Sequence, residues 1–253
     1  NNYKLDLKLS EFDQIAFFWI GNDITIPTYL VNSINTVYNK KVKIHHLTNF
    51  TTAKIPGVRK TIRQDLPKDI MLARIMAYKN FPYNKNLTFF CDADSLFIQK
   101  LDLFKLKQDV YLINRSEDFI MNHLWPEYYP EFEKKNALKV MPHLFGGMAF
   151  RNGGEFFSNL YKTCLQLPDR FHRWYGDQYS LMLNIKTTNE IVNYLPQDTY
   201  LNIVRKSLIN KDYSILLKKN VKMITFKGPD TKRFIEQSYY NLIDYYEQNN
   251  LIS

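Results

Sequence analysis

The stretch LTFFCDADSLFIQ at residues 87–99 decides the fold. Residues 87–91 are hydrophobic and rich in strand-forming types, which predicts a buried strand. This strand runs into Asp92 and Asp94, which are separated only by Ala93, and apolar character resumes at residues 96–98. In open α/β sheets ligands bind beyond the carboxyl ends of the strands. We therefore expect both carboxylates to lie in a binding crevice on a rigid support.

Two carboxylates at this spacing can face one divalent cation if the backbone turns at Ala93. A hard cation held by one or two protein carboxylates keeps coordination positions for water and for phosphate oxygens. Asp92 and Asp94 therefore predict Mg²⁺ or Mn²⁺ recruited to a diphosphate. The alternative is a solvated Asp-x-Asp turn that merely closes a strand, and this short motif alone leaves both interpretations open.

The composition fits a globular α/β protein with an anionic partner. The chain has 253 residues, of which 45% are hydrophobic, enough for one large α/β domain or two small ones. Its formal net charge of +9 suits a nucleotide diphosphate, nucleic acid or an anionic membrane surface. The lysines are scattered rather than clustered, so charge alone does not choose among these partners.

Cysteine content and hydropathy indicate the compartment. Cys91 and Cys164 are the only cysteines, and Cys91 falls inside the predicted central strand, which argues against a disulfide framework or a cysteine-ligated zinc site. The longest apolar runs, such as residues 15–20, are too short to span a bilayer, and no signal peptide precedes them. We expect a cytoplasmic protein, with peripheral membrane association left open. Because the chain begins with Asn1, we also expect it to be excised from a longer polypeptide.

The chain opens with a β–turn–α–β pattern. Residues 14–20 predict a buried strand, residues 27–38 repeat apolar side chains with helical spacing, and residues 42–47 alternate as a second strand. This is the start of a nucleotide-binding α/β domain. The sequence has no Gly-x-Gly-x-x-Gly and no Walker-type lysine loop, which argues against classical dinucleotide and P-loop chemistry.

The middle of the chain adds a helix, a strand and a long connection. The apolar pattern of residues 67–81 predicts a helix that contains Arg74. An arginine there suits a nearby carboxylate partner, a diphosphate, or both. Residues 110–114 predict another strand. The aromatic, mixed-charge connection at residues 116–136 fits no regular element and is typical of a substrate loop.

Two later segments carry further candidate site residues. In HLFGGMAFRN at residues 143–152, Gly146 and Gly147 either allow close approach by a ligand or form a bulge. A helix is predicted at residues 155–165. In the following WYGDQYSLMLNI, Asp177 either caps a helix or supplies an acid to the same cleft.

The last predicted strand, residues 221–226, runs into a Gly-Pro turn flanked by cations. Exposed backbone N–H groups and the charges of Lys227 and Lys232 make this turn a candidate phosphate clamp, although a solvated basic turn is equally compatible. Residues 235–252 predict an amphipathic helix or tail. Because there are no internal repeats or obvious linkers, we expect residues 1–253 to form a single domain.

Taken together, these segments resemble a GT-A fold glycosyltransferase, and most closely glycosyltransferase family 8 and its relatives, which are metal-dependent and retaining. The resemblance extends from about residue 14 to residue 234. It implies a single Rossmann-like nucleotide-sugar-binding domain with a mixed central sheet flanked by helices. Asp92 and Asp94 would match the acids that bind Mn²⁺ or Mg²⁺, with Asp92 also touching the ribose.

The resemblance also implies roles for the other candidates. Asp177 and Gln178 match the pair beside the donor sugar, where catalysis occurs. The remaining matches contact the donor: Arg74, Gly146, Gly147, Lys227, Gly228 and Lys232. The sequence departs from the family in its late motif, His-x-x-Gly-x-x-Lys-Pro-Trp, because Thr225 replaces the metal-binding histidine and one residue is inserted before Lys232. A third protein ligand of the metal is therefore left open.

The expected function is transfer of a sugar from a nucleoside diphosphate donor, preferably a UDP-sugar, to a glycan, a glycolipid or another hydroxyl acceptor. Retention is implied only by the resemblance, and inversion with Asp177 as the base is an alternative. A nucleotidyltransferase would need an N-terminal glycine-rich signature that is missing. A non-catalytic basic module remains a competing class, but scattered lysines and strand-end acids argue against nucleic acid. The sequence does not indicate the oligomeric state.

Overall fold

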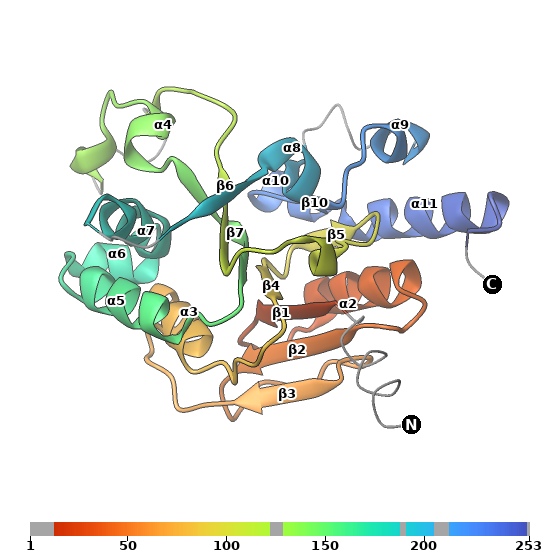
Figure 1. Cartoon of the computed structure of the whole chain (residues 1–253), viewed down its shortest axis with the longest axis horizontal. Helices are drawn as coiled ribbons and strands as arrows, with labels where there is room; N and C mark the ends of the chain where they lie inside the picture. The colour runs from red at the N-terminus through yellow and green to blue at the C-terminus, as the bar shows by residue number, and fades with distance from the viewer. Residues whose placement is uncertain (1–12, 122–128, 188–190, 205–212, 252–253) are drawn as a thin grey trace.

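The computed structural model describes residues 13–121, 129–187, 191–204 and 213–251 (Figure 1). A seven-stranded sheet of order β3-β2-β1-β4-β7-β6-β8 crosses the molecule. Its strands are β1 (Gln14–Phe18), β2 (Lys43–Thr48), β3 (Lys60–Arg63), β4 (Thr88–Cys91), β6 (Val110–Asn114), β7 (His143–Phe150) and β8 (Asn193–Pro196). Strand β7 runs antiparallel to β4 and β6, whereas the other neighbouring pairs are parallel. The expected mixed α/β sheet is therefore confirmed.

A second, three-stranded sheet of order β5-β10-β9 lies beside the end of β4. It consists of β5 (Ser95–Phe97), β9 (Asn202–Ile203) and β10 (Met223–Thr225). Strand β10 pairs antiparallel with β5 and parallel with β9. The late strand predicted at residues 221–226 is thus present but shorter, and it belongs to this small sheet rather than to the central one.

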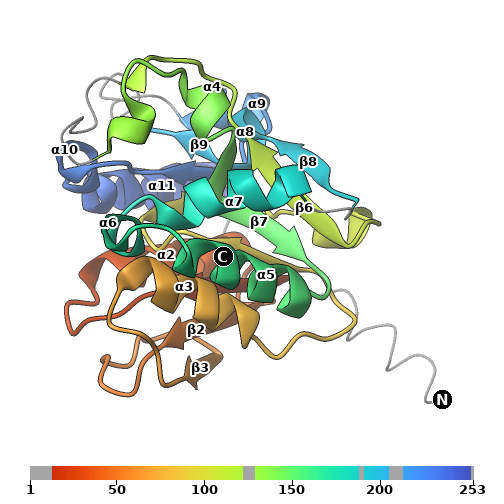
Figure 2. The same ribbon diagram turned by 90° about the vertical axis from the view of Figure 1, so that its left-hand side faces the viewer.

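Helices cover both faces of the central sheet (Figure 2). Helices α2 (Thr25–Val37) and α11 (Ile235–Gln248) pack together on one face. Helices α3 (Ile70–Lys79), α5 (Gly154–Leu165) and α7 (Gly176–Thr187) pack together on the other. The shorter helices are α4 (Ala137–Val140), α6 (Asp169–Arg173), α8 (Gln197–Tyr200), α9 (Tyr213–Lys218), α10 (Pro229–Lys232) and the 3₁₀ turns Leu103–Lys105 and Pro130–Phe132.

The hydrophobic residues of β1 show why the sheet needs helices on both faces. Ile15 and Phe17 belong to the core on the α2 side, whereas Ala16 and Phe18 belong to the core on the α3 side. Successive side chains of a strand point to opposite faces, so a continuous hydrophobic run requires both faces to be covered. Phe89 and Phe90 divide in the same way on β4.

The element boundaries differ from the predicted ones where local geometry interrupts the apolar pattern. Helix α3 begins at Ile70 rather than near residue 67, because the backbone of Asp69 is extended with φ −74° and ψ 121°. Strand β3 was not predicted, since its side chains are exposed or half-buried and show no hydrophobic alternation. The C-terminal helix is confirmed through Gln248, and Ile252 of the predicted range lies outside the described residues. No helix in the described ranges has both the length and the hydrophobicity needed to cross a membrane.

A third, smaller hydrophobic cluster consists of buried and half-buried aromatic rings and includes residues of α6 and α7. We call it the aromatic cluster, and it comprises Tyr129, Phe132, Phe171, Tyr175 and Tyr179. Two of its members come from the long connection at residues 116–136. Of that connection, residues 122–128 lie outside the described ranges.

His45 on β2 gives the fold a pH-dependent weakness. Its ring meets Phe81 edge-on at a centroid distance of 5.4 Å, and neither ring nitrogen has a hydrogen-bond partner. Burial, together with the smaller effect of the positive charges of Lys60 and Lys43, lowers the pKa of His45 to about 4. Protonation therefore favours the unfolded chain, in which the pKa returns to about 6.5.

We expect acidification from about pH 7 to about pH 5 to lower the free energy of unfolding, with His45 contributing about 1–2 kcal/mol of the loss. Across this window the unfolded chain takes up the His45 proton and the folded chain does not. His45→Gln cannot titrate, so its free energy of unfolding should fall less. Urea unfolding of both proteins at the two pH values measures the difference, and equal pH dependence would contradict the assignment.

Candidate functional site

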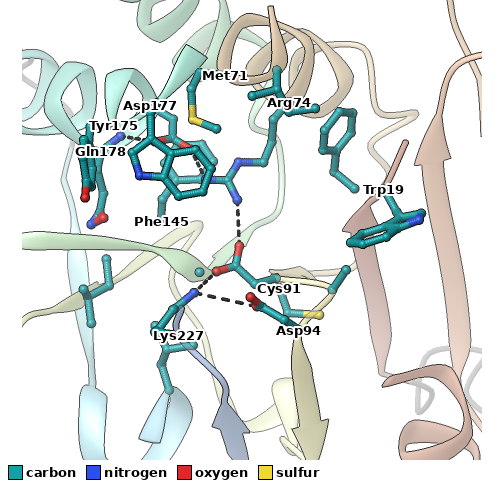
Figure 3. Close-up of a pocket in the computed structure, with 18 of the residues that line it drawn as sticks. Trp19, Met71, Arg74, Cys91, Asp94, Phe145, Tyr175, Asp177, Gln178 and Lys227 are labelled. Atoms are coloured by element: carbon teal, nitrogen blue, oxygen red, sulfur yellow. Dashed lines mark hydrogen bonds and ion pairs between the residues drawn. The ribbon is translucent and has the colours of Figure 1, made fainter. Parts of the chain in front are cut away.

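A cleft of about 450 Å³ opens at the carboxyl ends of β1 and β4 (Figure 3). Its walls come from the end of β1, helix α3, the turn after β4, strand β7, the start of α7 and the segment after β10. The predicted site residues that line it are Arg74, Asp92, Asp94, Gly146, Asp177, Gln178, Lys227, Gly228 and Lys232. The fold thus brings together residues that lie far apart in the sequence.

The loop that carries the two acids is fixed by backbone hydrogen bonds on both sides. The Asp92 N–H donates to the Gly146 carbonyl over 3.1 Å, which continues the pairing of β4 with β7. The Phe226 N–H donates to the Asp94 carbonyl over 2.9 Å, just beyond β10. Asp92 and Asp94 therefore project from a rigid turn between β4 and β5, as the sequence predicts.

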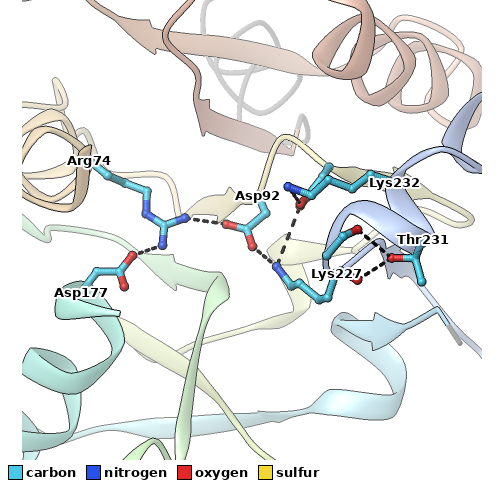
Figure 4. A network of polar contacts seen from close by, with 8 residues as sticks. Arg74, Asp92, Asp177, Lys227, Thr231 and Lys232 are labelled. Carbon is cyan, nitrogen blue, oxygen red and sulfur yellow. Dashed lines mark hydrogen bonds and ion pairs between the residues drawn. The ribbon is translucent and has the colours of Figure 1, made fainter. Parts of the chain in front are cut away.

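Acids and bases alternate through the cleft in a single chain of ion pairs (Figure 4). Its members, in order, are Asp177, Arg74, Asp92, Lys227, Asp94 and Lys232. The Nη1 of Arg74 lies 2.7 Å from Oδ1 of Asp92, and its Nη2 donates to Asp177. Because three carboxylates face three cations, the charges of this chain cancel.

The second half of the chain links Asp92 and Asp94 to the segment after β10. Lys227 Nζ donates to Oδ2 of Asp92 and lies 3.8 Å from Oδ1 of Asp94. Lys232 Nζ lies 2.9 Å from Oδ2 of Asp94. The lysine side chains are 42% and 37% exposed, whereas both carboxylates are 12% exposed. The cations thus lie on the solvent side of the acids.

The ion pairs keep both partners charged. Burial alone would raise the pKa of Asp92, but the positive charges of Lys227 and Arg74 outweigh it and hold that pKa well below its usual range. Burial would likewise lower the pKa of Lys227, but the carboxylates of Asp92 and Asp94 outweigh it and raise that pKa. At neutral pH the Asp92–Lys227 pair is a carboxylate beside an ammonium.

Helix α3 holds Arg74 between two acids that belong to different elements. The guanidinium stacks over the Phe145 ring, 4.5 Å from its centroid, which fixes the plane of the fork. One arm reaches Asp92 after β4 and the other reaches Asp177 on α7. Arg74 is therefore a carboxylate partner, as one of the sequence alternatives predicts, and it connects Asp92 to Asp177.

Of the two alternatives for Asp177, the structure supports the acid in the cleft, because Asp177 is the second residue of α7 and therefore lies inside the helix rather than at its N-cap. Its Oδ1 accepts the Gln178 N–H over 2.7 Å in the first turn of α7, and its Oδ2 accepts from Arg74 at the cleft wall. The side chain is 4% exposed. A Cβ on Gly176 would collide with the Phe171 carbonyl, so glycine allows α6 and α7 to meet closely here.

Gly228 turns the chain from β10 into α10. Its φ of 78° lies in the left-handed region, which favours glycine, and it immediately precedes the first residue of α10. This turn brings both Lys227 and Lys232 to the cleft. The expected Gly-Pro turn is thus present, and a short helix extends it.

The paired glycines form the bulge that was one of the two alternatives for them. Across β6 and β7 the register jumps from Leu112 opposite Met148 to Ile113 opposite Leu144, so residues 145–147 bulge out. The two glycines then face different surroundings. A Cβ on Gly146 would lie 2.6 Å from Asp92 Oδ2, whereas one on Gly147 would lie 2.7 Å from Ile113 Cδ1. Gly147 is not among the residues that line the cleft, and its predicted role at the sugar site stays a prediction.

We expect alanine to have separable effects at these two glycines. Gly147→Ala should lower the free energy of unfolding by about 1–3 kcal/mol, because its methyl overpacks the core. Gly146→Ala should displace the Asp92 carboxylate and weaken the binding of Mn²⁺ with UDP that the sequence predicts. Urea unfolding and calorimetric titration distinguish the two effects. Gly154→Ala is the control, since a Cβ there meets its nearest atoms at 3.8 Å, and identical behaviour of the Gly146 and Gly147 variants would refute the assignment.

The donor set fits a hard divalent cation. Asp92 and Asp94 offer carboxylate oxygens, and Asp94 Oδ1 is buried without a hydrogen-bond partner although Lys227 lies nearby. Within the described ranges no cluster of three His, Cys, Asp or Glu side chains completes such a site. Thr225, at the family's histidine position, is fully buried in β10 and does not line the cleft. Ions of the Mg²⁺ type keep several waters, so two protein ligands suffice.

Sequence reasoning missed the aromatic residues of the cleft. Trp19 at the end of β1, together with Trp174 and Tyr175 before α7, contributes to its lining. The signal for the last two was their position immediately before Gly176 and Asp177. Trp19 lies at the carboxyl end of the first predicted strand, residues 14–20, where a ligand is expected in α/β sheets.

Comparisons with known proteins place this fold. No protein-family model matches the sequence, and no curated protein matches it significantly. The chain is similar in structure to a glycosyltransferase involved in glycosylation of the major capsid of PBCV-1, with TM-score 0.57, 10% identity and coverage of 90% of this chain and 99% of that one. It is also similar to the galactosyltransferase LgtC in complex with donor and acceptor sugar analogs, with TM-score 0.55, 10% identity and coverage of 91% and 95%.

A third similar structure is the glycosyltransferase GlyE of Streptococcus pneumoniae TIGR4, with TM-score 0.53, 14% identity and coverage of 94% of this chain and 64% of that one. All three are glycosyltransferases by name. At these identities the likeness concerns the fold. It confirms the predicted resemblance to GT-A fold glycosyltransferases over about nine-tenths of the chain.

Proposed function

We propose that this chain, which has the fold of GT-A glycosyltransferases, is a metal-dependent glycosyltransferase that uses a nucleoside diphosphate sugar, preferably a UDP-sugar. The observation that carries the proposal is the alternating chain of ion pairs at the carboxyl end of β4, inside a cleft of about 450 Å³. Such a network suits a ligand that brings its own cation and anion, because the balance of charge is kept when both enter.

Asp92 and Asp94 would hold the Mg²⁺ or Mn²⁺ ion. Bound there, the ion would act as a Lewis acid that neutralises the charge of the leaving diphosphate. Lys227 and Lys232 are the more exposed partners of these acids, so their ammonium groups are available to phosphate oxygens. Arg74, Gly146 and Gly228 line the same part of the cleft and would complete donor binding.

Asp177 and Gln178 would act at the transferred sugar. Arg74 orients the Asp177 carboxylate, and the start of α7 holds Gln178 beside it. A carboxylate at this position would stabilise the positive charge that develops on the sugar ring, or orient the acceptor hydroxyl. We propose retention of configuration because of the resemblance to retaining family members. Proton NMR of the product's anomeric centre distinguishes retention from inversion.

The acceptor in this proposal is a glycan or a glycolipid. The similarity to LgtC, whose structure holds donor and acceptor sugar analogs, supports a sugar-bearing acceptor. A cytoplasmic location, a single domain over residues 1–253 and a sugar-site role for Gly147 belong to the same proposal. Peripheral membrane association is compatible with it, since the net charge is +9.

The proposal predicts metal-dependent release of a nucleoside diphosphate that requires both strand-end acids. Wild-type protein with Mn²⁺ should release UDP from at least one UDP-sugar and stop when chelator is added. Asp92→Asn and Asp94→Asn should fold but lose about 10² to 10³ in rate, or about 2–4 kcal/mol of transition-state stabilisation. The assay is a panel of UDP-, GDP- and ADP-sugars, with melting temperatures of each variant.

Asp109→Asn is the matched control for the acid variants, because the Asp109 side chain is 73% exposed and forms a surface ion pair with Arg151. It should retain the wild-type rate. Full activity in both strand-end variants would end the metal assignment. No heat of binding for UDP with Mn²⁺ would end the donor assignment.

The two lysines should matter more for turnover than for donor affinity. Point charges aimed at the leaving diphosphate gain strength as negative charge develops there, so Lys227→Ala and Lys232→Ala should each lower kcat about tenfold or more with a smaller change in the donor Kd. Steady-state kinetics and calorimetry on the same samples measure the two quantities. Lys219→Ala, at an exposed position after α9, is the control, and an unchanged kcat in a folded double variant would show that the turn is merely solvated.

A further inference from the structure

We infer that Trp174 forms the acceptor subsite, where its indole stacks against the apolar face of a pyranose ring. The inference rests on the proposed function and deepens it, because it makes the acceptor a sugar ring rather than a simple alcohol or a protein hydroxyl. Three features of Trp174 support this inference: its exposed indole, the hydrogen bonds of its backbone, and its position close to Asp177 in the sequence.

Trp174 combines exposure with a position in the cleft. It is 50% exposed and lines the cavity, and no other cleft-lining residue is among the large, strongly exposed hydrophobic side chains of the described chain. An exposed indole presents a large, rigid apolar surface with a polar N–H at its edge. Sugars have the matching chemistry, since one face of a pyranose carries C–H groups and its rim carries hydroxyls.

The backbone beneath Trp174 is held in an uncommon conformation. Tyr175 has φ 63°, in the left-handed region that costs a residue with a Cβ about 1–2 kcal/mol. Aromatic contacts within the aromatic cluster offset this cost, because the Tyr175 ring meets Tyr129 at 5.2 Å and Phe132 at 5.9 Å between centroids. The unfavourable backbone conformation of Tyr175 is therefore stabilised by the packing of its own ring, directly beside Trp174 in the cleft.

Further contacts fix Trp174 itself. The backbone N–H of Trp174 donates to the Arg170 carbonyl over 3.3 Å, and the backbone carbonyl of Trp174 accepts from the Tyr129 hydroxyl over 3.4 Å. Its ring packs against Tyr175 at 5.9 Å with an interplanar angle of 77°. A side chain with few free torsions loses little entropy when a ligand stacks on it. Trp174 is thus an exposed apolar surface that is already in position.

The order of residues across the cleft assigns this surface to the acceptor. Figure 3 shows Tyr175 and Gln178 on one side of Arg74 and Trp19 on the other. The lysines that suit the diphosphate pair with Asp92 and Asp94, and Arg74 separates those acids from Asp177. The reacting sugar would lie by Asp177 and Gln178. Trp174 lines the same cleft and precedes Asp177 by only Tyr175 and Gly176, so we assign it to the sugar end.

Saturation-transfer NMR with simple pyranosides tests this subsite without relying on turnover. The probes are methyl β-galactopyranoside, methyl β-glucopyranoside and lactose, each with the protein, UDP and Mg²⁺, since Mn²⁺ would broaden the signals. At least one probe should receive saturation, mainly at the ring protons of one face. Trp174→Ala should weaken its Kd about five- to tenfold, the scale of a lost aromatic contact, and Trp174→Phe should recover part of it.

Phe104→Ala controls for loss of an exposed aromatic ring, because Phe104 is 64% exposed and lies outside the cleft. It should leave the pyranoside Kd unchanged. Calorimetry of UDP on the same samples separates donor binding from acceptor binding. If wild type binds UDP but no pyranoside, or if Trp174→Ala keeps its pyranoside Kd, the acceptor subsite is wrong and the donor proposal stands. If wild type does not bind UDP, both fall.

Discussion

The burial of the Asp92 carboxylate is the constraint on which the arrangement of this molecule depends. It lies at the end of the central strand, 12% exposed, and an unpaired buried carboxylate would cost several kcal/mol. Its partners come from α3 and from the segment after β10, and the Gly146 backbone leaves room for it. The helix on one side and the C-terminal third of the chain on the other must therefore both dock before this charge is compensated.

How much of the fold could be predicted depends on which physical signal each element carries. Strand β4 is continuously hydrophobic because both its faces are covered, so the pattern of residues 87–91 sufficed. Strand β3 lies at the edge of the sheet with polar, half-exposed side chains, and β9 has only two residues. Short and polar strands are defined by pairing with distant segments, and local sequence contains little information about such pairing.

The candidate site divides in the same way. Asp92 and Asp94 stood out because two acids interrupt an apolar run, and Arg74 because it is charged within an apolar helix. The contact between Arg74 and Asp177 spans 103 residues and could not be inferred from spacing. Trp174 was overlooked because an aromatic residue in a chain with 18 tyrosines and 18 phenylalanines is ordinary until its exposure is known. The glycine pair left two alternatives open, and only the register of β6 with β7 assigned each residue its surroundings.

The small sheet has a consequence for how quickly the site can respond to a ligand. Because β10 pairs with β5 and the Phe226 N–H donates to the Asp94 carbonyl, the acidic loop and the basic segment share one hydrogen-bonded frame. The lysines cannot leave the carboxylates by movement of one segment away from the other without breaking that frame. Their charge must be redirected by rotation about side-chain bonds, which takes picoseconds to nanoseconds, whereas loop and domain movements take up to milliseconds. Adaptation of the charged centre is thus faster than any closure of the backbone around it.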